Sequence, residues 1–247
     1  MSEILEYYSL SQIVVILVET ETPGNLGASA RAMKSMGLTS LRLVNPFRRE
    51  SRDAYVRAVH AQDVLQHADH FATLNEAIAD CAIVIGTTGK IERLDQPRYT
   101  PKELVSFLHT YHSTAKIALV FGRESQGLTV EELSLCHAHV RIPTNPACPS
   151  LNLGSAVQVL CYELFVGLLI EPSTSPSTSQ VELASHEQLT YLLTQLETLA
   201  VKVGALNSSK PGQMMRKMRE LFGRSTPRKA ELNLLINVFK RLLKKLA

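Results

Sequence analysis

Residues 13–36 read IVVILVETETPGNLGASARAMKSM, and this stretch decides the fold class. Its first part, Ile13–Val18, is a run of apolar and mostly β-branched residues, typical of a strand that is buried on both faces. Pro23 and Gly24 mark a turn, and Leu26–Met36 has the composition and spacing of a helix. A strand, a turn and a helix in this order form the first half of a βαβ unit, which predicts a parallel sheet.

The same alternation continues to residue 170. Further strands are expected at the short apolar runs 41–44, 82–85, 117–121 and 139–142, and helices at 74–80, 101–111, 129–136 and 151–169. Thr129 and Glu132 have the spacing of a capping box, which predicts that a helix begins there. We therefore expect residues 1–170 to form one α/β domain with a mostly parallel sheet.

The composition is that of an ordinary globular protein. The chain has 247 residues, of which 45% are hydrophobic and 20% charged, and this length can bury a core without metal or disulfide support. The four cysteines have no CxxC spacing, so neither a zinc site nor a disulfide framework is expected. The first residues lack a signal-peptide pattern, and the most apolar stretch, 156–170, is too short to span a bilayer. These features predict a cytoplasmic protein that binds neither membrane nor metal.

The positive charge is concentrated in the last quarter of the chain. Residues 185–247 hold 12 Lys and Arg against 4 Asp and Glu, a net charge of +8, whereas residues 1–184 hold 14 against 19, a net charge of −5. Between the two parts lies the segment EPSTSPSTSQ at 171–180, from which we place a flexible linker at 171–184. A basic appendage favours a polyanionic partner, although a solvated basic face that binds nothing is the alternative.

Two amphipathic helices are expected in this appendage. In Met214–Phe222 the apolar face comprises Met214, Met218, Leu221 and Phe222, and the polar face comprises Arg216, Arg219 and Glu220. In Glu231–Leu246 the apolar face comprises Leu232, Leu235, Phe239, Leu242 and Leu246. Residues 185–247 are thus predicted to form a small all-α extension.

Four loops that contain glycine or proline follow the predicted strands, at 22–27, 86–89, 122–127 and 143–152. Ligands of open α/β sheets bind at the carboxyl ends of the strands, so we expect the site at this edge. Turns that need glycine for conformational reasons are the alternative for any single loop. The chain has no GxGxxG after its first strand and no GxxxxGK[ST], which disfavours a nicotinamide dinucleotide fold and excludes a P-loop.

Three ordered segments carry a family resemblance: Asn25–Arg31 (NLGASAR), Val120–Leu128 (VFGRESQGL) and Ile142–Asn152, which ends in SLN. They resemble the three motifs of the SPOUT superfamily and, more narrowly, of its TrmH-like branch of RNA ribose 2′-O-methyltransferases. The appendage, with KPGQ at 210–213 and ELN at 231–233, is similar to the helical extension of the TrmJ type. That type methylates cytidine or uridine 32 in the anticodon loop of tRNA.

The resemblance implies more than the residues alone predict. It implies a deep C-terminal trefoil knot, S-adenosyl-L-methionine as the methyl donor, a tRNA substrate, and a homodimer in which each site is completed across the interface. Two other functions stay open, a ribosomal-RNA ribose 2′-O-methyltransferase and a non-catalytic RNA-binding relative. The helical extension argues against the first, and the intact Arg31, Ser150 and Asn152 argue against the second.

The resemblance also implies roles for individual residues. The cofactor would be bound by Thr87, Thr88, Gly89, Gly122, Ile142, Ser150 and Leu151, largely through backbone groups. The catalytic set would be Arg31, Asn25, Ser150, Asn152 and Glu124. Lys90 stands where many relatives have arginine, which leaves its role open.

Each catalytic residue has a structural alternative. Asn25, Ser150 and Asn152 could instead cap helix amides, and Arg31 could form a surface ion pair. Glu124 could brace its loop or pair with Arg31 or Arg123. A guanidinium stays protonated at any working pH, so we expect Arg31 to clamp a phosphate or stabilise the developing alkoxide rather than act as a base.

Overall fold

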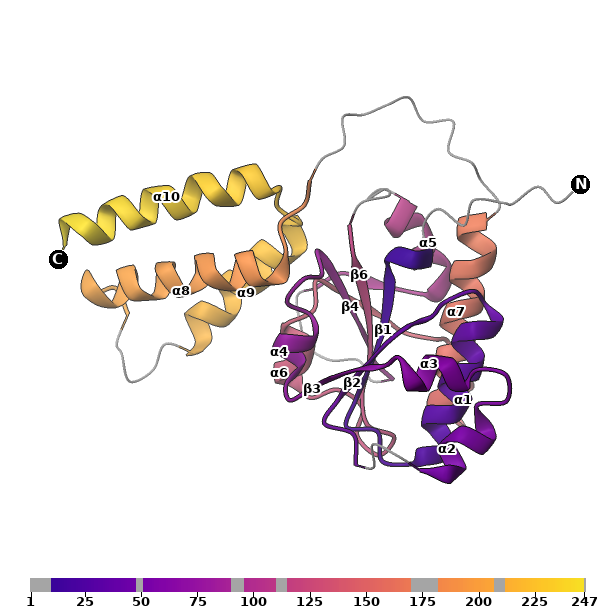
Figure 1. Cartoon of the computed structure of the whole chain (residues 1–247). Helices are drawn as coiled ribbons and strands as arrows, with labels where there is room; N and C mark the ends of the chain where they lie inside the picture. Colours follow the sequence, from indigo (N-terminus) through magenta and orange to yellow (C-terminus); the bar gives the residue numbers. More distant parts are fainter. Residues whose placement is uncertain are drawn as a thin grey trace, which may run out of the picture.

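The computed structural model describes residues 10–47, 51–89, 96–109, 115–169, 182–206 and 212–246. Lys90 and most of the predicted linker at 171–184 lie outside these residues. In the described part of the chain, seven parallel strands form one sheet in the order β3-β2-β1-β6-β4-β7-β5 (Figure 1). They are β1 (Ile13–Val18), β2 (Ser40–Val44), β3 (Asp69–Phe71), β4 (Ile83–Thr87), β5 (Arg98–Tyr99), β6 (Ile117–Phe121) and β7 (Ala138–Val140).

The sheet confirms the predicted α/β class and the five predicted strands, with small shifts of their ends. β4 extends to Thr87 and β7 ends at Val140, two residues earlier than predicted. The sequence pattern missed β3 and β5. Both are edge strands of two or three residues and contain charged or polar side chains, so neither has the apolar run that identifies a buried strand.

The central strands are continuously apolar because each strand faces two cores. Along β1, the side chains of Ile13, Val15 and Leu17 belong to one hydrophobic cluster. Those of Val14, Ile16 and Val18 belong to a second cluster on the other face of the sheet. Successive side chains of a strand point to opposite faces, so a sheet covered on both sides needs apolar residues at every position.

Helices cover both faces of the sheet. They are α1 (Pro23–Ser35), α2 (Arg52–Arg57), α3 (Gln62–Gln66), α4 (Leu74–Ala77), α5 (Pro101–His109), α6 (Val130–Ser134) and α7 (Leu153–Leu169), after a 3₁₀ turn at Leu10–Gln12. In Figure 1, α1, α5 and α7 lie on one side of the sheet, and α4 and α6 on the other. The capping box of Thr129 and Glu132 is present at the start of α6, as predicted. The pattern missed the short helices α2 and α3.

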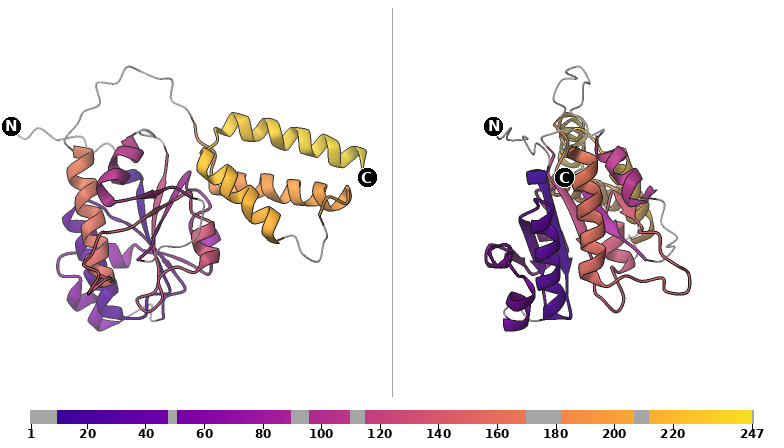
Figure 2. Two further views of the ribbon diagram at one scale, coloured as in Figure 1. Left: turned by 180° about the vertical axis from the view of Figure 1, so that it is seen from behind. Right: turned by 90° about the vertical axis from the view of Figure 1, so that its right-hand side faces the viewer.

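The appendage consists of α8 (His186–Lys202), α9 (Gly212–Ser225) and α10 (Lys229–Lys245), which extend to one side of the α/β domain (Figures 1 and 2). Its apolar side chains form a third cluster of their own, which includes Leu192, Leu193, Leu232 and Ile236. The appendage is therefore helical, as the sequence predicted. Its two predicted helices correspond to α9 and α10, whereas α8 and the separate core were not predicted.

Parts of the predicted apolar faces were wrong. Glu220, assigned to the polar face of its helix, is 7% exposed, whereas Leu221 is 45% exposed. The reason is that α9 turns Met215, Glu220 and Gly223 inward. In α10 the buried residues are Leu232 and Ile236, and the predicted Leu242 and Leu246 are exposed.

The appendage is attached to the α/β domain through the start of α8. The backbone N–H of His186 donates to the carbonyl of Cys81 (2.8 Å), and the N–H of Glu187 donates to that of Ala79 (3.0 Å). The His186 ring lies edge-on to the His137 ring at 6.4 Å between centroids. Residues 79–81 precede β4, so the appendage is attached at the amino-terminal edge of the sheet.

Candidate active site

A pocket of about 270 Å³ lies at the carboxyl ends of β4, β6 and β7. All seven residues predicted to bind the cofactor line it, namely Thr87, Thr88, Gly89, Gly122, Ile142, Ser150 and Leu151. The other lining residues are Phe121, Arg123–Gly127, Val140, Thr144, Pro149, Leu153 and Ala156. Loops far apart in the sequence meet here because parallel strands end at one edge of the sheet.

Gly122 allows the loop after β6 to fold back tightly on itself. A Cβ atom at this position would lie 2.1 Å from the carbonyl carbon of Gly127, closer than any real side chain approaches a backbone. The loop is closed by paired backbone hydrogen bonds between Arg123 and Gly127, and Gly127 has a φ of +73°. Both glycines are therefore required for the shape of this pocket wall.

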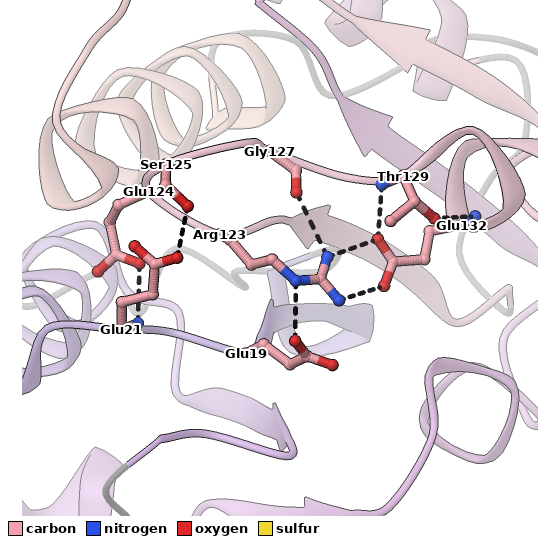
Figure 3. A network of polar contacts seen from close by, with 8 residues as sticks. All are labelled: Glu19, Glu21, Arg123, Glu124, Ser125, Gly127, Thr129 and Glu132. Atoms are coloured by element: carbon pink, nitrogen blue, oxygen red, sulfur yellow. Dashed lines mark hydrogen bonds and ion pairs between the residues drawn. The ribbon is translucent and has the colours of Figure 1, made fainter.

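The Arg123 side chain holds this loop against its neighbours (Figure 3). Its Nε donates to Glu19, at the end of β1, at 2.8 Å. Its two terminal nitrogens donate to the Glu132 carboxylate of α6 at 2.9 and 3.1 Å. The side chains of Arg123 and Glu132 are each 16% exposed, and that of Glu19 is 43% exposed. Bidentate contacts of this kind fix both orientation and distance, so Arg123 ties the loop to two secondary structure elements.

Glu124 joins the same loop to the segment that follows β1. Its carboxylate accepts hydrogen bonds from the backbone N–H groups of Glu21 (2.9 Å) and Thr22 (3.1 Å) and from the side-chain amide of Asn25 (2.7 Å). Burial raises the pKa of the Glu124 carboxyl, but hydrogen bonds from Glu21 and Asn25 lower it more, and the pKa lies below its ordinary value. Glu124 is therefore an ionised brace, and it pairs with neither Arg31 nor Arg123.

A chain of side-chain hydrogen bonds connects all three motifs. The amide of Asn25 donates to Glu124, and its carbonyl oxygen accepts from the amide of Asn152 at 2.9 Å. The side-chain oxygen of Asn152 accepts a hydrogen bond from the backbone N–H of Gly154, in the first turn of α7, at 2.9 Å. Because a carboxylate can only accept, Glu124 determines the orientation of both amides.

These hydrogen bonds decide whether Asn25 and Asn152 cap their helices. Asn25 does not cap its helix, because the N-cap position of α1 is Thr22 and the Asn25 side chain is bonded to Glu124 and Asn152. Asn152 does bond to an amide at the start of its helix, as the alternative reading proposed, and it contacts Asn25 at the same time. Ser150 is exposed and lines the pocket.

Arg31 is not among the residues that line the pocket. It lies on α1 six residues after Asn25, about 9 Å further along the helix axis. Its side chain is exposed, and within the described part of the chain it forms no ion pair, so the predicted alternative of a surface ion pair is not observed. One copy of the chain thus brings Asn25, Glu124 and Asn152 together and leaves Arg31 apart from them.

The sequence reasoning missed the structural role of Arg123 and its partners. Glu19 lies 104 residues before Arg123 and Glu132 lies nine residues after it, and nothing in the local pattern marks these two carboxylates as partners of one arginine. The only available signal was that Arg123 and Glu124 follow Gly122 at a strand end. The described residues contain no group of three or more His, Cys, Asp or Glu side chains that could hold a metal ion. No described helix is long and apolar enough to cross a membrane.

Family models and relatives match the chain along almost its entire length. Residues 12–162 match the SpoU rRNA Methylase family, and residues 187–246 match the C-terminal domain of tRNA methyltransferase TrmJ. The chain is 41% identical to the tRNA (cytidine/uridine-2′-O-)-methyltransferase TrmJ of Photorhabdus laumondii, covering 92% of this chain and 94% of that protein. It is also 41% identical to the tRNA (cytidine/uridine/adenosine-2′-O-)-methyltransferase TrmJ of Pseudomonas aeruginosa, covering 92% and 91%.

Solved structures agree with these matches. TrmJ from Z. mobilis ZM4 superposes with a TM-score of 0.81 at 30% identity, covering 93% of this chain and 98% of that one. A probable methylase family protein from Haemophilus influenzae superposes with a TM-score of 0.64 at 36% identity, covering 96% and 97%.

Proposed function

The chain belongs to the SpoU rRNA methylase family, and from this premise we propose that it transfers a methyl group from S-adenosylmethionine to the 2′-hydroxyl of cytidine or uridine 32 in tRNA. Methylation of a tRNA ribose follows from the relatives of that name, which are 41% identical over 92% of the chain. The identity of the methyl donor and the position of the methylated nucleotide go beyond what the names of these relatives state. The pocket that gathers all seven predicted cofactor residues carries the proposal.

Two other functions are less well supported. Methylation of ribosomal RNA would not explain why residues 187–246 match the TrmJ C-terminal domain. A purely RNA-binding role would not explain why Asn25, Glu124 and Asn152 are connected beside a formed pocket. Both are outcomes of the experiment described below.

The residues of the pocket fit S-adenosylmethionine. Phe121, Leu151 and Leu153 supply apolar wall suited to an adenine ring, and the loops at 87–89 and 122–127 present backbone groups for polar atoms. A Cβ atom on Gly89, which lines the pocket, would have no atom of the described residues within 4 Å. A bound ligand could therefore approach the backbone closely at this point.

Bound S-adenosylmethionine supplies a methyl group on a positively charged sulfur. The protein must hold that group in line with the ribose oxygen, and such positioning can contribute several kcal/mol. We assign this positioning to Glu124, Asn25 and Asn152. Both carboxylate oxygens of Glu124 and both polar side-chain atoms of Asn25 already form hydrogen bonds that hold the loops together. Ser150 presents its hydroxyl at the pocket wall, where it can hydrogen-bond to the ribose or the cofactor.

Arg31 requires a second protomer in this proposal. Its guanidinium is exposed and lies outside the pocket of its own chain, which agrees with a homodimer in which each site is completed by the partner. There its permanent charge would clamp a phosphate or stabilise the developing alkoxide. The outer face of α7 supports a contact between copies, because Tyr162 is 51% exposed there.

The trefoil knot is also part of the proposal. β7 lies between β4 and β5, two strands that are consecutive in the sequence, and this strand order agrees with a knotted chain. We propose that the segment 142–152, which leads from β7 to α7, forms the knot. The pocket walls from Ile142 to Leu151 would then belong to the knot itself.

We assign residues 1–170 to the methyltransferase domain, and we assign the extension to tRNA binding through the net charge of +8 on residues 185–247. The extension begins earlier than predicted, because Ala184 is buried in its core and the N–H of Ala184 donates to the carbonyl of Pro227 at 3.0 Å, so the linker predicted at 171–184 ends before Glu182. The extension is attached before β4, and the pocket lies after it. Five strand residues separate these points by about 16 Å. The extension of one chain thus contacts a part of the tRNA away from the ribose at its own pocket. A tRNA substrate also agrees with action in the cytoplasm.

The test is methylation of unmodified tRNA by the full chain with S-adenosylmethionine, with every 2′-O-methyl group mapped. We expect modification of nucleotide 32 in a subset of tRNAs, without added metal. Arg31→Ala should lower the rate by about 10²–10³-fold and leave cofactor affinity unchanged, whereas Lys34→Ala, a control on the same helix, should be nearly silent. Modification of ribosomal RNA alone, or loss of cofactor affinity in parallel with the rate of Arg31→Ala, would contradict the proposal.

A further inference from the structure

The loop from β7 to α7 forms one wall of the pocket but has no regular secondary structure. Five of its residues line the pocket, namely Ile142, Thr144, Pro149, Ser150 and Leu151. The residues at 143, 146 and 149 are prolines, which have no N–H group to donate. In the segment 142–151, all of which the structure describes, one backbone–backbone hydrogen bond is present, from the N–H of Cys148 to the carbonyl of Asn145 at 2.8 Å. Side-chain hydrogen bonds must therefore contribute to the shape of this wall.

Two side chains supply such hydrogen bonds. The side-chain oxygen of Asn145 accepts from the N–H of Ala147 at 2.9 Å, which forms a turn at the tip of the loop. The hydroxyl of Thr144 donates to the carbonyl of Pro149 at 2.9 Å and joins the two ends of the loop around this turn. Threonine is β-branched, so the rotation of its side chain is restricted and its hydroxyl is held in few positions.

The contact between Thr144 and Pro149 bears directly on Ser150. The carbonyl that accepts the hydrogen bond belongs to the peptide group between Pro149 and Ser150, which is planar and trans. A hydrogen bond that holds this carbonyl therefore also fixes the direction of the Ser150 N–H, on the opposite side of the peptide group. Within the described residues, neither the N–H nor the hydroxyl of Ser150 forms a hydrogen bond, so both are available to a ligand in the pocket.

We propose that Thr144 is a positioning residue of the active site. Its hydroxyl fixes the peptide group between Pro149 and Ser150 and so determines where Ser150 lies beside the bound cofactor and the target ribose. Thr144 acts through Ser150, because its own hydroxyl proton is already used in the bond to Pro149. Small errors in the position of a reacting group lower the rate of a reaction that depends on alignment. The proposal rests on the proposed function and adds a residue to its site.

The experiment compares two substitutions of Thr144 in the full chain. Thr144→Val removes the hydroxyl and keeps the branched shape, whereas Thr144→Ser keeps the hydroxyl. In calorimetry, Thr144→Val should bind S-adenosylhomocysteine about 3–10-fold more weakly, which is the effect of one hydrogen bond, and kcat at saturating tRNA should fall by a similar factor. Thr144→Ser should stay within about twofold of the wild type in both measurements. The midpoint of urea unfolding should not change, because Pro149 is exposed and water can replace the lost hydroxyl.

Hydrogen exchange gives a readout that needs no cofactor. The amides of Ala147 and Cys148 should exchange faster in Thr144→Val than in the wild type, because the ends of their loop are no longer joined. Thr198→Val is the matched control. The Thr198 hydroxyl donates to the carbonyl of Thr194 at 2.9 Å on α8, so this substitution removes the same kind of hydrogen bond in the appendage. It should change neither the affinity for S-adenosylhomocysteine nor the exchange of the loop amides.

The outcomes separate this role from a purely structural one. Unchanged affinity and kcat in Thr144→Val would overturn the proposal, and so would unchanged exchange of the loop amides, whether or not the chain binds the cofactor. Equal losses in Thr144→Val and Thr144→Ser, or a urea midpoint that falls together with the affinity, would also overturn it. If the wild type methylates no tRNA but the variants keep the expected order of cofactor affinities, the proposed reaction is rejected and the role of Thr144 in the pocket is supported.

Discussion

Replacing Arg123 by methionine should lower both the free energy of unfolding and the affinity of the pocket for S-adenosylhomocysteine. The substitution keeps much of the side-chain volume and removes the guanidinium that bonds Glu19 and Glu132 at 2.8 to 3.1 Å. Breaking a buried ion pair costs about 3–5 kcal/mol, and breaking an exposed pair costs about 0–1 kcal/mol. Arg123 and Glu132 are 16% exposed and Glu19 is 43% exposed, so the loss should lie between these limits, at about 2–3 kcal/mol.

For a chain of this length, that loss corresponds to a fall in Tm of about 4–12 °C. The effect should depend on pH, because the hydrogen bond from Arg123 is the main cause of the lowered pKa of Glu19. A carboxyl with a lowered pKa in the folded state stabilises the protein above its unfolded pKa and loses this contribution as the pH falls. The difference between wild type and Arg123→Met should therefore be larger at pH 7 than near pH 4.

Urea unfolding gives the stability, and calorimetry with S-adenosylhomocysteine gives the affinity. Arg123→Lys should be intermediate, because one ammonium group cannot replace a fork that bonds two carboxylates. Glu19→Gln, which removes only the more exposed contact, should cost less than about 1 kcal/mol. If Arg123→Met unfolds and binds as the wild type does, the loop is held by its backbone alone and the reasoning is wrong.

Three further predictions concern the glycine loop, the buried histidines and the appendage. Gly122→Ala should abolish cofactor binding, since its Cβ would lie 2.1 Å from the Gly127 carbonyl carbon, and Gly212→Ala, with nothing within 4 Å, should bind normally in the same calorimetric assay. Burial lowers the pKa of His137 to about 4 and that of His186 to about 3, so stability should be complete above about pH 6.5 and decline below it. His186→Leu should reduce that slope in pH-dependent unfolding, and an unchanged slope would contradict the assignment. A chain that ends at Ser179 should stay folded and bind the cofactor, since the appendage has its own core. It should lose most of its affinity for tRNA and most of the salt dependence of that affinity. If the shortened chain precipitates in gel filtration, the appendage covers the α/β domain and the prediction is wrong.

The five buried strands were predictable because each is a continuous apolar run, which is a local pattern. Continuous apolar runs such as Ile13–Val18 indicate strands that face two cores, and glycine-containing loops after them indicate a ligand edge. The edge strands β3 and β5 and the helices α2 and α3 were not predictable in the same way. They are short, and the sheet and α1 hold them in place, so their sequences need no strong propensity of their own.

In the candidate site, too, the sequence predicted which residues take part but not which contacts they form. The motifs identified Asn25, Glu124 and Asn152, but whether Asn25 caps a helix or contacts Glu124 depends on the distance between two loops that are 99 residues apart. The inward turn of Glu220 has the same origin, because a helical wheel cannot show which side of α9 meets α8 and α6.

The sequence by itself determined the α/β class, the position of the pocket at the strand ends, seven of the residues that line this pocket, and the helical appendage with its excess of positive charge. These follow from periodicity, from strand ends that share one edge, and from the resemblance carried by three motifs. Only the tertiary structure decided that Arg123 bridges Glu19 and Glu132, that Glu124 orients both asparagines, and that Arg31 lies outside the pocket of its own chain. The physical reason is that hydrogen bonds act over about 3 Å, and the sequence contains no record of which distant residues come that close.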